Sequence, residues 1–268
     1  MDANTQTDQA IQAYAASLRD FRTLACAVPD AEWSVPTDLP GWTVQDVMSH
    51  VTGVESDLLG RPATGHTPDF GALPYVQDPF AQYVEVAVDA RRAWSPAEVR
   101  ANLLDVIDER VLLLDAGEVE ANGPAVAFFG SLEQLLVMRP FDAWVHEQDV
   151  RRATRRPGNL AGTGAQVTAA AIRSLLPYVV GKRVKPGPGT CVRWTVTGEL
   201  AFVETVLIDG DGRAALAPDY PGEPTVTLSA SWEAFALIAS GRAAAAQPTV
   251  TGDAKLGSQV LDQMTVTP

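Results

Sequence analysis

Hydrophobic residues recur every three or four positions through most of the first 158 residues, the spacing of one face of an α-helix. The first such run predicts a helix over Asp8–Ala27, and Pro29 ends it. Three more runs predict helices over Thr43–Leu59, Pro79–Arg92 and Pro96–Leu114. A further long helix is predicted to open at Ser131 and to end before Pro157. The first half of the chain is therefore predicted to be helical.

Two of these helices carry local start signals. Thr43 is an N-cap residue with Asp46 three positions later, which are the two halves of a capping box. Ser95 precedes a proline at the first helical position and Glu98 at the third. Because each signal satisfies backbone N–H groups at a helix end, both helix starts are well defined.

Two stretches rich in glycine and proline interrupt the helical pattern, Gly60–Asp78 and Ala116–Phe129. The first is longer than a simple connection between helices needs to be, and long loops often have functional roles. It contains His66, which we expect to border a substrate site rather than to bind an ion.

The pattern changes after Gly158. One helix is predicted over Gly164–Val179, followed by runs with the two-residue alternation of strands and then by two short helices. The strands are predicted for Cys191–Val196, Ala201–Ile208 and Pro224–Leu228, and the short helices for Trp232–Ile238 and Asp253–Met264. This change predicts two domains, a helical one over residues 1–158 and a smaller α+β one over residues 159–268.

Candidate chemistry lies in the long helix that opens at Ser131. Asp142 and His146 are four residues apart, so both side chains lie on one helix face, and Asp149 extends that face. His50 lies beside the apolar stripe of the helix predicted over Thr43–Leu59. Burying a carboxylate and an imidazole is costly unless a partner satisfies them, and a metal ion would satisfy both. The residues alone leave a second interpretation open, since Asp–His pairs at this spacing also occur as plain contacts on a helix face.

Composition narrows the possible partners. The chain has 268 residues, of which 46% are hydrophobic, which is the balance of a globular protein. Its formal net charge of −13 argues against nucleic acid or an anionic membrane surface as the main partner. The two cysteines are too few for a disulfide framework, and the N-terminus lacks the basic and apolar segments of a signal peptide, so we expect a cytoplasmic protein.

Two segments together resemble the mycothiol-dependent maleylpyruvate isomerase family. The first reads Pro-Gly-Trp-Thr-Val from Pro40, with Asp46 and His50 following. The second reads Phe-Asp-x-Trp-x-His-Glu-Gln-Asp-Val-Arg-Arg from Phe141. The resemblance implies a fold of α + (α+β) type, in which a DinB-like four-helix bundle is followed by a smaller α+β domain similar to sterol-carrier-type domains. The segment Gly241–Leu261 resembles part of that second domain.

The same resemblance implies a divalent metal, most often zinc, bound by His50, Asp142 and His146. It also implies mycothiol as a cosubstrate, and Arg242 as a catalytic residue that orients a carboxylate. Two departures stand out. The isomerase would have Glu at the position of Asp142, whose side chain is one methylene shorter than that of Glu. Pro140 predicts a kink or a restart of the helix just before the ligand pair.

We therefore expect a metal-dependent enzyme that activates a low-molecular-weight thiol for isomerisation or thiol transfer, acting on a small-molecule substrate as a monomer or a weak homo-oligomer. Two alternatives remain at this point. One is a metal-dependent hydrolase, such as an amidase acting on a thiol conjugate. The other is a non-catalytic small-molecule-binding protein.

Overall fold

A computed structural model describes residues 3–63, 65–119, 129–242, 246 and 248–267. The contacts between Cα atoms divide the chain into two compact units, Met1–Gly158 and Asn159–Pro268. Most of the irregular stretch predicted for Ala116–Phe129 lies outside the described residues, as do Thr64 and four residues of the segment Gly241–Leu261. Each unit is described by itself below.

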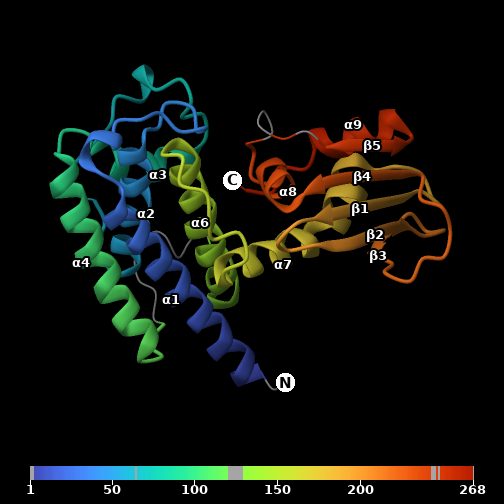
Figure 1. Cartoon of the computed structure of the whole chain (residues 1–268), viewed down its shortest axis with the longest axis horizontal. Helices are drawn as coiled ribbons and strands as arrows, with labels where there is room; N and C mark the ends of the chain where they lie inside the picture. The colour runs from blue at the N-terminus through green and yellow to red at the C-terminus, as the bar shows by residue number, and fades with distance from the viewer. Residues whose placement is uncertain (1–2, 64, 120–128, 243–245, 247, 268) are drawn as a thin grey trace. The chain divides into compact units, whose positions relative to one another are not determined.

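The first unit is helical (Figure 1). Its α-helices are α1 (Ala3–Ala27), α2 (Val44–Leu58), α3 (Pro79–Asp89), α4 (Pro96–Asp115) and α6 (Leu132–Ala153). Two short 3₁₀ turns, η1 (Asp30–Glu32) and η2 (Phe70–Ala72), lie in the connections. The core forms where the apolar faces of α1, α2, α4 and α6 meet, and Trp33 from the loop after α1 is fully buried in it. The helical character predicted for this half of the chain is confirmed.

Helix α2 begins where the sequence predicts. Thr43 accepts a hydrogen bond from the Asp46 backbone N–H at 3.3 Å, and the Asp46 carboxylate accepts one from the Thr43 backbone N–H at 2.8 Å. This capping box fixes the first turn of α2, and His50 follows one turn later with its side chain buried. The position of His50 is therefore set by local sequence.

Helix α6 begins after Ser131, whose hydroxyl accepts from the backbone N–H of Gln134. The helix then continues through Pro140 without interruption, so of the kink or restart predicted there, the restart does not occur. Proline removes one backbone hydrogen bond, to the Leu136 carbonyl. Arg139 and Phe141 on either side of it are buried and the flanking turns hold the helix, so this loss is tolerated.

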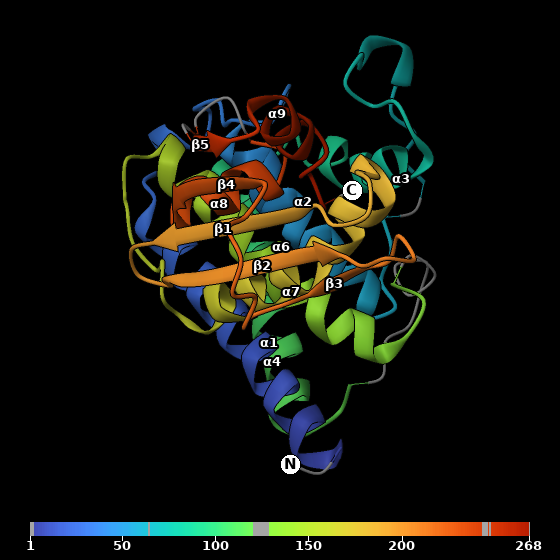
Figure 2. The ribbon, with the colours of Figure 1, turned by 90° about the vertical axis from the view of Figure 1, so that its right-hand side faces the viewer.

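The second unit is a mixed five-stranded sheet with helices packed on it. Its strands are β1 (Cys191–Thr197), β2 (Phe202–Ile208), β3 (Ala214–Leu216), β4 (Val226–Ser231) and β5 (Thr249–Gly252). Figure 2 shows them side by side in the order β3-β2-β1-β4-β5. Among the strand pairs of the described residues, β1–β4 is parallel and the other three are antiparallel. The mixed sheet with helices confirms the coarse fold class expected for this half.

The helices of this unit are α7 (Thr163–Tyr178), a π-helical turn η3 (Val179–Val184), α8 (Trp232–Ala239) and α9 (Ala254–Asp262). The alternation predicted three of the strands but not β3 and β5, which are short and add to the two edges of the sheet. In the part of the chain that the structure describes, every helix is too short or too polar to span a bilayer.

Candidate metal centre

His50 of α2 meets Asp142 and His146 of α6. One ligand atom from each of the three residues lies within 4.8 Å of the others. The Nε2 atoms of both histidines lie 3.4 Å from the Asp142 carboxylate, His50 from Oδ2 and His146 from Oδ1. The two imidazole rings are 4.6 Å apart between centroids. Two helices thus bring together two nitrogens and a carboxylate, as the sequence predicts.

The tautomer of His146 is set by its neighbour on α6. Its Nδ1 lies 3.1 Å from Oδ2 of Asp149, a carboxylate that is fully buried and also paired with Arg152 at 2.6 Å. An ionised carboxylate only accepts hydrogen bonds, so Nδ1 is the donor. The lone pair of the neutral ring is then on Nε2, which faces Asp142. This is the arrangement by which carboxylates orient metal-binding histidines.

His50 has no such partner. Both of its ring nitrogens are buried and make no hydrogen bond to any residue in the part of the chain that the structure describes. The 3.4 Å approach of Nε2 to Asp142 lacks hydrogen-bond geometry. A buried polar group left in this state costs free energy, and such groups are rare in native proteins. An ion bound at Nε2 would give that nitrogen a partner.

Burial and nearby charges give the three groups of the cluster different pKa shifts. Burial lowers the pKa of His50 and outweighs the attraction of Asp142, so its ring stays neutral at neutral pH. Burial would also lower the pKa of His146, but Asp142 and Asp149 outweigh it and raise that pKa. For Asp142, burial opposes ionisation, yet Arg139 and the two histidines hold its pKa well below the usual value. Asp142 is therefore ionised at neutral pH.

Arg139 links this carboxylate to the core of the unit. Its Nη1 donates to Asp142 Oδ2 at 2.6 Å, while Nε and Nη2 both donate to Glu55 Oε1. Glu55 is completely buried and its other oxygen accepts from the Tyr14 hydroxyl, with Arg110 3.5 Å away. We call Tyr14, Glu55, Arg110 and Arg139 the buried ion network. Its members come from α1, α2, α4 and α6, one from each helix.

An aromatic wall stands beside the cluster. The Trp42 ring lies 5.2 Å from that of His50 and 6.1 Å from that of His146, between centroids. The Trp42 indole N–H donates to Glu85 at 3.0 Å, and Glu85 also accepts from Tyr75 and pairs with Arg92. Trp42 is held in place by these contacts, so it can keep water from one side of the cluster.

The cluster is reached from the side of Asp142. The Asp142 side chain is 27% exposed, against 5% for His50 and 9% for His146. Three side chains leave room on a tetrahedral or five-coordinate ion for a ligand from outside. The arrangement can therefore hold an ion with an accessible coordination position rather than a closed structural one.

The structure places the other candidate residues elsewhere. His66 lies 2.7 Å from Asp89 and is outside the cluster. Arg242 follows α8 in the second unit, where its side chain is buried and donates to the Ser240 carbonyl. Sequence reasoning missed Arg139 and Trp42. Arg139 precedes Asp142 by three residues on the same helix, a spacing that could have indicated the contact.

The first unit is helical and carries a cluster of two histidines and one aspartate, and a unit with a mixed sheet follows it. Together these features describe the class of protein to which the chain belongs. A family profile described as "Mycothiol maleylpyruvate isomerase N-terminal domain" matches residues 14–151, which include all three cluster residues. The chain belongs to this family.

Two solved structures resemble the whole chain. The mycothiol-dependent maleylpyruvate isomerase is 18% identical, covers 94% of this chain and 96% of its own, and superposes with a TM-score of 0.51. A variant of that isomerase with one histidine replaced by alanine is 16% identical, with coverages of 93% and 96% and the same TM-score. At this identity the likeness establishes the fold. No curated protein sequence matches the chain.

Proposed function

We propose that the chain is a metal-dependent enzyme that uses a low-molecular-weight thiol, mycothiol, as cosubstrate in an isomerisation or a thiol transfer. The observation that carries the proposal is the buried cluster of His50, Asp142 and His146, in which the His50 nitrogens have no hydrogen-bond partner among the described residues. Two imidazoles and one carboxylate are a donor set that suits zinc. Membership in the family supports mycothiol as the thiol.

The residues of the chain have distinct parts in this proposal. His50, Asp142 and His146 would hold the ion, Asp149 would orient His146, and Trp42 would exclude water from one side. When bound, the ion would stabilise the ionised form of a thiol at neutral pH, where a free thiol with a pKa near ~8.5 is mostly protonated. No separate base is then required.

The hydrolase alternative needs a base that activates water. Three carboxylates close to the cluster in sequence are all engaged. Glu55 is bound to Arg139 and Tyr14, Asp149 to His146 and Arg152, and Glu147 to Arg151. These pairings favour the thiol route. The intact set of His50, Asp142 and His146 argues against a purely non-catalytic binding protein.

We infer a DinB-like four-helix bundle for the helical unit and a sterol-carrier-type fold for the second unit, a division into functional domains at residues 158 and 159, and a cytoplasmic monomer or weak homo-oligomer. We also keep Arg242 as the residue that orients a substrate carboxylate. The family and the order of elements support the first two.

The proposal predicts a spectroscopic change on thiol binding. Protein loaded with cobalt is expected to gain a sulfur-to-metal charge-transfer band when mycothiol or a short analogue is added, because the accessible coordination position would take the thiolate. The band should be absent for the His50→Ala variant treated in the same way. An unchanged spectrum together with a water-dependent hydrolysis would replace this proposal with the hydrolase alternative.

A second prediction concerns Asp149. The Asp149→Asn variant is expected to bind zinc about ten- to 100-fold more weakly, because the carboxylate that orients a ligating histidine is lost. Competition with a chromogenic chelator measures the affinity. The matched control is Glu147→Gln, on the same helix, which breaks a pair with Arg151 and leaves the three ligands untouched. Equal affinities of the two variants would show that Asp149 does not orient His146.

A further inference from the structure

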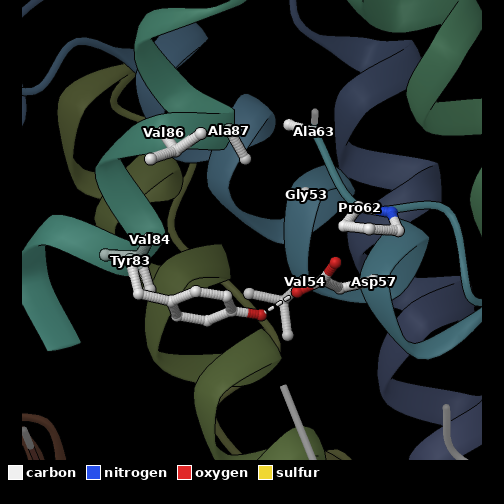
Figure 3. Close-up of a pocket in the computed structure, with 9 residues that line it drawn as sticks. All are labelled: Gly53, Val54, Asp57, Pro62, Ala63, Tyr83, Val84, Val86 and Ala87. Carbon is white, nitrogen blue, oxygen red and sulfur yellow. Dashed lines mark hydrogen bonds between the residues drawn. The ribbon is translucent and has the colours of Figure 1, made fainter. Parts of the chain in front are cut away.

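A cavity of about 310 Å³ lies between α2 and α3 (Figure 3). Helix α2 contributes Gly53, Val54 and Asp57 to its wall, and α3 contributes Tyr83 and three small apolar residues. The loop after α2 closes one side with Ala63 and the proline before it. The lining is mostly aliphatic, so the cavity suits an apolar group.

The polar end of this cavity is a carboxylate. Asp57 is 4% exposed and accepts a hydrogen bond from the Tyr83 hydroxyl, which points at it across the cavity (Figure 3). Burial and the neighbouring Asp57 raise the pKa of Tyr83, so its hydroxyl stays protonated and remains the donor. A carboxylate accepts up to about four hydrogen bonds, so it can receive a ligand donor beside the Tyr83 hydroxyl.

The arginine side chains near the cavity form hydrogen bonds with residues outside its lining or with the backbone. None of its nine lining residues is basic. Arg139 donates hydrogen bonds to Glu55 and Asp142. Arg91, beyond Ala87, donates to the Ala87 carbonyl at 2.8 Å and to Asn102 at 3.0 Å. Asp57 is therefore the acidic residue among the nine that line the cavity, and no basic residue among them offsets it.

The cavity and the metal cluster share one face of α2. Gly53, Val54 and Asp57 follow His50 by three, four and seven residues, which places all of them on the same side of the helix. At ~1.5 Å per residue, Asp57 lies roughly 10 Å further along the helix axis than His50. The cluster and the cavity are therefore separated along α2 by about the length of a small substrate.

We propose that this cavity is the subsite for an apolar part of the substrate and that it selects a group ending in an organic cation, such as an amine, over one ending in a carboxylate. Its role as part of the substrate site rests on the proposed function, whereas its ligand preference does not. Placing a second carboxylate beside Asp57 in an apolar wall would be strongly unfavourable, while an ammonium group would be attracted. Anionic oxo acids such as maleylpyruvate are then poor occupants of this cavity.

The test uses three probes of similar size, 2-phenylethylamine, 2-phenylethanol and phenylacetate, titrated against the metal-free full-length protein by calorimetry or ligand-observed NMR. The amine is expected to bind at least about tenfold more tightly than phenylacetate, which corresponds to ~1.4 kcal/mol. The Asp57→Asn variant keeps an acceptor for Tyr83 and is expected to lose this preference. Asp105→Asn removes an equal charge from the exposed face of α4 and should leave it unchanged.

A second variant keeps the test independent of Asp57. Ala63→Phe places a ring at the half-exposed loop side of the cavity and is expected to weaken all three probes without disturbing helix packing. The proposal is overturned if phenylacetate binds as tightly as the amine, if no probe binds, or if the amine binds both variants as it binds the wild type.

A last measurement separates this proposal from the function proposed above. In cobalt-loaded protein, the paramagnetic ion should broaden the NMR signals of the bound amine relative to the zinc form, because both would lie on the same face of α2. A bound amine that cobalt does not affect would overturn the shared substrate site and leave the ligand preference standing. Protein that binds no metal would overturn the proposed function, while the metal-free titrations would still decide the preference.

Discussion

Replacing Arg139 by methionine is expected to lower the free energy of unfolding by about 3 kcal/mol, since breaking a buried ion pair leaves an uncompensated charge in the core. Arg139 is almost fully buried and is the nearest cation to Glu55, which is completely buried. The expected loss is at the lower end for buried pairs because Arg110 and the Tyr14 hydroxyl still contact Glu55. Urea denaturation followed by circular dichroism measures it.

Two controls test the cause of this loss. The double variant Arg139→Met with Glu55→Gln should recover part of the stability, because the buried charge is then removed together with its partner. Arg19→Met breaks a pair with Asp115 that is nearly half exposed, and should change stability by less than about 1 kcal/mol. If Arg139→Met costs no more than Arg19→Met, the buried ion network does not stabilise the fold.

The His50→Ala variant is expected to lose zinc while remaining folded. The ring nitrogens of His50 make no hydrogen bond to the described residues, so removing this side chain leaves no hydrogen-bonding partner unsatisfied. The loss of affinity should exceed about 100-fold, since even residues that only orient a ligand account for ten- to 100-fold. Elemental analysis after dialysis gives the metal content, and circular dichroism shows whether the helices persist.

The third histidine of the chain provides the matched control. His66→Ala removes an imidazole that pairs with Asp89 on the surface, so this variant should keep its full zinc content. Equal zinc content in the His50 and His66 variants would contradict the assignment of the cluster as a metal site. Asp142→Asn should fall between them, because the amide keeps one oxygen but loses the charge that attracts the ion.

Local signals made the cluster predictable. The capping box of Thr43 and Asp46 fixes the start of α2, and the four-residue spacing of Asp142 and His146 fixes their shared face on α6. The contact between the two helices then follows from their apolar stripes. Residues that interact over short sequence distances thus indicated the site, and the family resemblance pointed to the same three residues as candidate ligands.

The buried ion network could not be predicted in the same way. Arg139 and Glu55 are 84 residues apart, and Tyr14 and Glu55 are 41 apart, so their pairing depends on how four helices pack. Nothing in the local pattern distinguishes Arg110 from an exposed arginine on the polar face of α4. The short edge strands β3 and β5 were missed for a related reason, because each is defined by its neighbour in the sheet rather than by its own alternation.

The packing of Tyr75 on Gly41 has a consequence for how this family can diversify. Gly41 has a φ of +77°, and a Cβ atom there would lie 2.2 Å from the Tyr75 ring, so only glycine fits. Tyr75 belongs to the long loop before α3 and shares Glu85 with Trp42, which flanks both histidines. Insertions or exchanges in that loop would therefore reshape the wall beside the histidines and leave all three of them unchanged. Evolution could alter substrate range by loop exchange alone, without passing through an intermediate that has lost its ligand set.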